Sequence, residues 1–144
     1  MAKKWAAFPH PERTYAYDTA GLKKAWARLH RGDCEPMPKD PGVLVAWQHY
    51  HAGAFGDAVE AGRKAEGAGI NAAVKAQMIY ANYLEKAEKA KLALLEEAAG
   101  WADARRDAAP KDANAHYLYA YALGRYSQGI SITKALAQDR KSVV

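Results

Sequence analysis

A helical pattern runs from Gly42 to Ala52, stops at Gly53 and resumes by Asp57, and this short interruption constrains the fold more than any other feature. Connections of a few residues join helices that lie side by side in opposite directions. Similar patterns recur over residues 72–84, 86–108 and 112–126. No segment shows the sustained alternation of apolar and polar residues that a half-buried strand requires. The sequence therefore predicts an all-α chain of antiparallel helix pairs.

The composition favours the same fold class. Alanine is by far the commonest residue and β-branched residues are few. Alanine loses no side-chain entropy in a helix, so such a composition favours helices. With 50% hydrophobic and 26% charged residues, the chain resembles an ordinary soluble globular protein. At 144 residues it is long enough to bury a core as one domain.

The N-terminal part is expected to differ from the rest. Residues 1–17 contain two prolines and several aromatic residues without helical periodicity, which predicts an extended arm. A helix over residues 19–31 follows, and its apolar residues form one stripe: Leu22, Ala25, Trp26 and Leu29. Three prolines and two glycines mark residues 32–42 as a connector. We therefore predict an arm followed by a single helical domain over residues 18–144, capped by its first helix.

The net charge of +5 comes from residues 1–31, because the remaining residues carry equal numbers of basic and acidic side chains. Dedicated DNA-binding proteins carry more cations than this one short helix, so a solvated face is favoured over a nucleic-acid site. No apolar run approaches the ~20 residues that span a bilayer, and the first residues lack the apolar segment of a signal peptide. We expect a cytoplasmic protein with neither a membrane nor a nucleic-acid partner.

The residues that could carry catalysis or bind metal are too dispersed to form a site. Cys34 is the only cysteine, which excludes an intrachain disulfide and a zinc-cysteine cluster. His49 and His51 are two residues apart and point to opposite sides of a helix, so they cannot chelate one ion from the same turn. The other histidines lack a neighbouring ligand pattern: His10, His30 and His116. We expect no catalytic residue, no metal and no cofactor, and therefore no enzyme.

The segment at residues 39–68 resembles a tetratricopeptide repeat. Residues of this segment match the small, turn and aromatic positions of that family: Ala46, Gly53, Phe55, Ala58 and Ala65. Ala81 and Ala120 repeat the small position of Ala46 at spacings of 35 and 39 residues. Small residues let helix backbones approach closely, and the aromatic residue fills the open end of the hairpin. The chain is similar to bacterial repeat proteins of this kind. The resemblance implies a right-handed α-solenoid with repeats at about 39–68, 72–108 and 112–138.

The same resemblance implies that the first helix of each repeat lines an inner, groove-forming face. Its side chains there are aromatic, apolar or amide-bearing, with scattered cations: Leu44, Trp47, Tyr50, His51, Met78, Asn82, Lys86, Asn114, Tyr117, Leu118, Tyr121 and Arg125. Such a set suits a peptide or protein segment held by aromatic anchors, which makes a non-catalytic binding scaffold the expected function. An alternative remains open, in which a neighbouring segment such as the arm, with Trp5 and Phe8, fills this face permanently.

The last repeat is expected to be incomplete. Gly129 is predicted to end the helix that begins at residue 112, and a short final helix is predicted from Ile130 to about Gln138. Several apolar residues are then left without a following helix to cover them: Ile130, Ile132, Leu136, Val143 and Val144. The preferred interpretation is a truncated form of a longer repeat array. The alternative is a structural or oligomerisation module, a homodimer that pairs through this edge.

Overall fold

The computed structural model describes the backbone of residues 5–142 and the side chains of residues 5–137. Within this range the chain is helical and contains no strand, which confirms the predicted all-α class. The helices are α1 (Thr19–Leu29), α2 (Pro41–His51), α3 (Phe55–Ala65), α4 (Gly69–Tyr83), α5 (Glu88–Ala108) and α6 (Ala113–Ser142). A single 3-10 turn at Arg13–Tyr15 is the only regular element between residues 5 and 18. The expectation for Val143 and Val144 lies outside the described residues.

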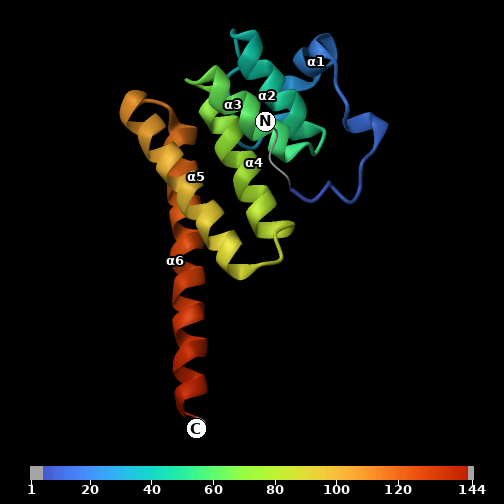
Figure 1. Ribbon diagram of the computed structural model, residues 1–144. Coiled ribbons are helices and arrows are strands. Elements are labelled where there is room, and N and C mark those ends of the chain that lie inside the picture. Colours follow the sequence, from blue (N-terminus) through green and yellow to red (C-terminus); the bar gives the residue numbers. More distant parts are fainter. Residues whose placement is uncertain (1–4, 143–144) are drawn as a thin grey trace.

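Each helix from α2 to α6 packs mainly against its neighbour in the sequence. In addition, α4 contacts both α2 and α6, so these three helices form one row (Figure 1). Helix α1 lies at the α2 end of this row, away from α5 and α6 (Figure 1). The main core lies between α4, α5 and α6, and a second core joins α1 to α2 and the start of α4.

The connection between α2 and α3 forms where the sequence predicts it. Gly53 has a φ of +80°, a conformation that glycine adopts without steric cost. The small residues Ala46 and Ala58 are fully buried on either side of this turn, as is Ala81 in α4. The third predicted small position is wrong, because Ala120 is exposed on α6. The buried stripe of α6 has the spacing of one helix face and consists of Ala115, Leu118 and Ala122.

Helix α6 differs most from the prediction. It runs for 30 residues without interruption, so the expected break at Gly129 and the separate last helix are wrong. A Cβ atom at Gly129 would collide with the side chain of Leu92 in α5. The glycine therefore allows α5 and α6 to approach closely, and a single glycine inside a helix costs only about 1 kcal/mol relative to alanine. Beyond this contact α6 projects past the ends of α4 and α5 (Figure 1).

The projecting part of α6 exposes apolar side chains. Ile132 is 53% and Leu136 is 59% exposed, and neither joins a hydrophobic core of the described residues. The two residues are four apart and therefore lie on the same side of the helix. The expectation that this edge pairs with a second copy of the chain stays a prediction.

Candidate functional site

Helix α1 covers the inner face of α2. Leu22 and Trp26 of α1 are buried against Leu44 and Trp47 of α2, and Trp47 is only 1% exposed. The indole nitrogen Nε1 of Trp26 donates a hydrogen bond of 2.8 Å to the carbonyl oxygen of Glu35, which fixes the connector to α1. Leu44 and Trp47, expected in an open groove, are therefore core residues. The segment that covers Leu44 and Trp47 is α1 with its connector, and Tyr17 at the end of the arm packs at the edge of this core.

A chain of buried polar groups crosses from the end of α1 to α4. His30 is 3% exposed, and its Nδ1 lies 3.0 Å from a carboxylate oxygen of Asp33. Its Nε2 lies 3.0 Å from Nε2 of His51 at the end of α2. Because the carboxylate can only accept, His30 carries its proton on Nδ1, and His51 donates from Nε2. Asp33 also accepts a 3.0 Å bond from Nζ of Lys75 in α4.

Burial keeps both imidazoles neutral. It lowers the pKa of His30, and it lowers the pKa of His51 to about 4, with smaller contributions from His30 and the positive charge of Lys75. A neutral pair is the state in which one imidazole donates and the other accepts. The two histidines therefore serve as a hydrogen-bonded link between α1 and α2.

This link makes the stability of the protein depend on pH. The unfolded chain binds protons on histidine below about pH 6.5, whereas folded His51 binds one only near pH 4. We therefore expect the free energy of unfolding to decrease as the pH falls from about 6.5 to about 4. His51→Gln keeps a donor toward His30 but does not titrate, so this variant should show a weaker decrease in urea unfolding at a series of pH values.

A control variant makes the pH experiment specific to the histidine pair. His49→Gln replaces the same residue type in the same helix outside the pair, and it should behave as the wild type does. Glu35 acts in the opposite direction, because burial raises its pKa and favours proton uptake by the folded protein. Since all variants retain Glu35, its contribution cancels between them. Identical pH dependence in His51→Gln and the wild type would contradict the neutral histidine pair.

A second carboxylate of the connector, two residues after Asp33, is buried. Glu35 accepts hydrogen bonds from the side-chain amides of Asn71 in α4, at 3.2 Å, and of Asn114 in α6, at 2.5 Å. Asn71 also donates to Asp112, which forms an ion pair with Arg105. Asn71 is buried inside α4, which begins two residues earlier at Gly69. The starts of α4 and α6 are thus joined through the connector.

The inner face is open beyond these hydrogen bonds. Tyr117, Tyr121 and Arg125 follow Asn114 by 3, 7 and 11 residues and therefore lie on the same side of α6. Tyr117 is 61% exposed, and its ring lies 6.0 Å from that of the half-buried Tyr121. The guanidinium of Arg125 lies 5.3 Å from the centre of the Tyr121 ring, and its Nη2 donates a 3.3 Å bond to the Tyr121 hydroxyl.

The facing side of α4 contributes one unsatisfied polar group. Asn82 lies 11 residues after Asn71 and therefore on the same side of α4. Its amide nitrogen is buried and has no hydrogen-bond partner among the described residues. Lys86 is exposed just beyond the helix. Met78 and Leu118, which were expected on this face, are instead buried in the core between α4, α5 and α6.

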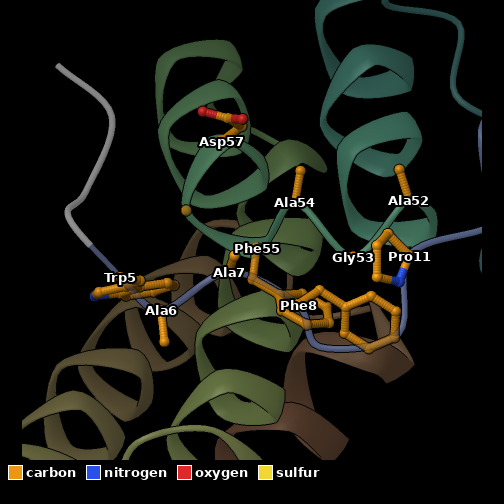
Figure 2. Close-up of a pocket in the computed structure, with 11 residues that line it drawn as sticks. Trp5, Ala6, Ala7, Phe8, Pro11, Ala52, Gly53, Ala54, Phe55 and Asp57 are labelled. Atoms are coloured by element: carbon orange, nitrogen blue, oxygen red, sulfur yellow. The ribbon is translucent and has the colours of Figure 1, made fainter.

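The remaining predicted positions, Tyr50 and His51, lie half-buried at the end of α2, beside the arm. The arm itself packs on the α2–α3 turn and on α4. The ring of Trp5 stacks on Tyr80 with centroids 4.1 Å apart, and the ring of Phe8 lies directly against Gly53. A cavity of about 350 Å³ remains between the arm and this turn, with Asp57 on its far side (Figure 2).

Comparisons of the chain with protein-family models, with curated proteins and with solved structures return no match. Between residues 5 and 142, no helix is long and apolar enough to cross a membrane. The side chains described in the structure also contain no group of three or more His, Cys, Asp or Glu residues that could hold a metal ion. The exposed tyrosine and arginine side chains of α6 and the cavities beside the arm are candidate sites.

Proposed function

We propose that the protein binds a short segment of another protein along the open inner face between α4 and α6. The observation that carries this proposal is the exposed Tyr117 beside Tyr121 and Arg125. Tyrosine and arginine are the residue types that dominate binding energy at protein interfaces. A tyrosine side chain that is mostly exposed contributes little to the core, so core packing does not explain why position 117 carries a tyrosine.

The chemistry of the face defines the segment. The tyrosine rings offer apolar contact area, and the Tyr117 hydroxyl lies on a side chain that is 61% exposed. Arg125 and Lys86 are exposed cations without an acidic partner in the described part of the chain. A segment with one large apolar side chain and a carboxylate group complements these features. The sequence resemblance to tetratricopeptide repeats, which bind peptides on their inner faces, supports the same conclusion.

The length of the segment follows from what covers the rest of the face. Helix α1 and the connector occupy the surface of α2 and the starts of α4 and α6. The open stretch of α6 runs from Tyr117 to Arg125, which corresponds to about 12 Å at the helical rise per residue. An extended segment of about four residues spans this distance. We therefore propose a short linear motif as the ligand, and no catalytic activity.

Replacement of both tyrosines by alanine tests the proposal. A peptide selected from a displayed random library against the wild-type protein serves as the probe. The double variant Tyr117→Ala, Tyr121→Ala should bind this peptide at least roughly a hundredfold more weakly in titration calorimetry, because two aromatic anchors are lost. Its circular dichroism should stay helical, since Tyr117 is mostly outside the core and Tyr121 packs only at the edge of it.

Leu123→Ala provides the matched control. Leu123 lies on the same helix, is 40% exposed and points to a different side from Tyr121, so its replacement should leave the affinity unchanged. Equal affinity of the double variant and the wild type for the selected peptides would contradict the proposed site. Unfolding of the double variant would contradict the assignment of the tyrosines to a binding surface.

A further inference from the structure

A small cavity of about 230 Å³ lies where the arm crosses the end of the α2–α3 hairpin. Its lining residues are Phe8 and Tyr15 of the arm, Tyr50 and His51 of α2, Gly53 of the turn, and Phe55 of α3. A cavity of this size is larger than one water molecule, which takes about 30 Å³, and smaller than the ~300–1,000 Å³ sites of drug-sized ligands. It therefore fits a compact group of a few heavy atoms.

Aromatic rings line this cavity, which is open to solvent on one side. Phe8 and Phe55 meet at 85° with their centroids 6.1 Å apart, and Tyr50 meets Phe55 at 62° with a centroid distance of 6.0 Å. Rings at such angles form walls around a space and do not stack into a single layer. The face of an aromatic ring carries negative electrostatic potential and attracts cations.

The described residues that line the cavity carry no charge near pH 7. None of them is a lysine or arginine, and burial lowers the pKa of His51 to about 4, so that this histidine is neutral. The adjoining cavity shares Phe8 and Phe55 and is lined by Asp57 (Figure 2). Asp57 lies outside the proposed cavity itself and forms no ion pair with another described residue.

The same aromatic cluster already accommodates a cation of the chain itself. Nζ of Lys75 lies 5.5 Å from the ring centre of Tyr50 and 5.9 Å from that of Trp47. Asp33 holds this lysine at 3.0 Å inside the polar cluster and neutralises its charge. Lys75 is therefore paired with Asp33 and is not among the residues that line the cavity beside the arm.

Tyr15 indicates that the cavity serves more than packing. Phe8 anchors the arm on Gly53, whereas Tyr15 is 39% exposed. Among the described residues, the ring and hydroxyl of Tyr15 have no aromatic contact and no hydrogen bond. The tyrosine nevertheless lines the cavity. Its ring therefore forms one side of the cavity while remaining partly open to solvent.

We propose that this cavity binds a trimethylammonium group, carried either by a methylated lysine of a partner protein or by a free small molecule such as choline. A quaternary ammonium has no N–H donor, so it loses no hydrogen bond when aromatic rings replace its hydration water. The rings compensate its charge through cation–π attraction. This site is separate from the face of α4 and α6.

Titration calorimetry with choline chloride tests the proposal, with 3,3-dimethylbutan-1-ol as the neutral compound of the same shape. Choline should bind saturably, and the alcohol at least roughly tenfold more weakly, because it lacks the charge. Tyr15→Leu, at an exposed position that leaves the fold intact, should weaken choline binding roughly tenfold. Tyr83→Leu, which alters a more exposed tyrosine at the end of α4, away from the cavity, should have no effect.

Two peptides distinguish the possible sources of the group. One carries a single trimethyllysine and the other the unmodified lysine at the same place. Tighter binding of the trimethyllysine peptide than of choline would identify a protein partner, and the reverse order would identify a small molecule. Equal affinity for choline and the neutral alcohol, no saturation with either trimethylammonium compound, or unchanged choline binding by Tyr15→Leu would overturn the proposal.

Discussion

Gly62→Ala is expected to lower the free energy of unfolding by about 3 kcal/mol, although it adds only one methyl group. Gly62 of α3 lies where this helix crosses the start of α4. A Cβ atom there would collide with the carbonyl oxygen of Gly69 and lie 3.0 Å from both N and Cβ of Ala73. These neighbours include backbone atoms, which cannot rotate away as a side chain can. The two helices would have to separate.

Gly124→Ala is the matched control for this prediction. It makes the same chemical change inside a helix, but no atom lies within 4 Å of the added Cβ. Alanine is favoured over glycine in a helix by about 1 kcal/mol, so this variant should be more stable than the wild type. Urea unfolding followed by circular dichroism measures both changes. Equal effects of the two substitutions would contradict the close crossing of α3 and α4.

Trp47→Ala is expected to cost about 3–5 kcal/mol, a large share of the 5–15 kcal/mol that stabilises a typical domain. The indole ring of Trp47 is 1% exposed and lies beside His30 and Trp26 of the α1 segment, with ring centroids 4.7 and 6.0 Å away. Lys75 of α4 lies on the same ring. Its removal would therefore leave a cavity between three helices and loosen α1 from the inner face.

Trp47→Phe separates packing from hydrogen bonding in this prediction. The indole nitrogen of Trp47 is buried without a hydrogen-bond partner in the described part of the chain, so its replacement by phenylalanine removes no hydrogen bond. This variant should lose much less stability than Trp47→Ala in the same urea experiment. A Trp47→Ala variant as stable as the wild type would show that α1 does not pack on α2 as described.

Local patterns predicted the helices well. Gly53 and the apolar spacing around it gave the α2–α3 hairpin, and the buried Ala46, Ala58 and Ala81 follow from the need for small residues between close helices. The predicted helix end at Gly129 is wrong because a glycine in a helical pattern can either end the helix or allow a close contact with a neighbouring helix. The two cases differ only in what lies opposite, and here Leu92, distant in sequence, decides.

The candidate site was predicted only in part. The tyrosine and arginine stripe of α6 follows from helical periodicity once its buried face is known. The cover formed by α1 and the connector could not be predicted in this way, because Asp33 and Glu35 lie in an irregular segment without periodicity. Their partners Lys75, Asn71 and Asn114 are 36 to 79 residues away. Only the tertiary structure reveals that these polar groups join one another.

The binding site itself is best tested by ¹⁹F NMR of protein labelled with fluorotyrosine. Each of the nine tyrosines gives a resonance, which single Tyr→Phe substitutions assign. Addition of the selected peptide should shift the signals of Tyr117 and Tyr121, which lie on the open face, and leave that of Tyr80, which the arm covers, unchanged. Shifts at Tyr80 with unmoved signals from Tyr117 and Tyr121 would contradict the proposed function.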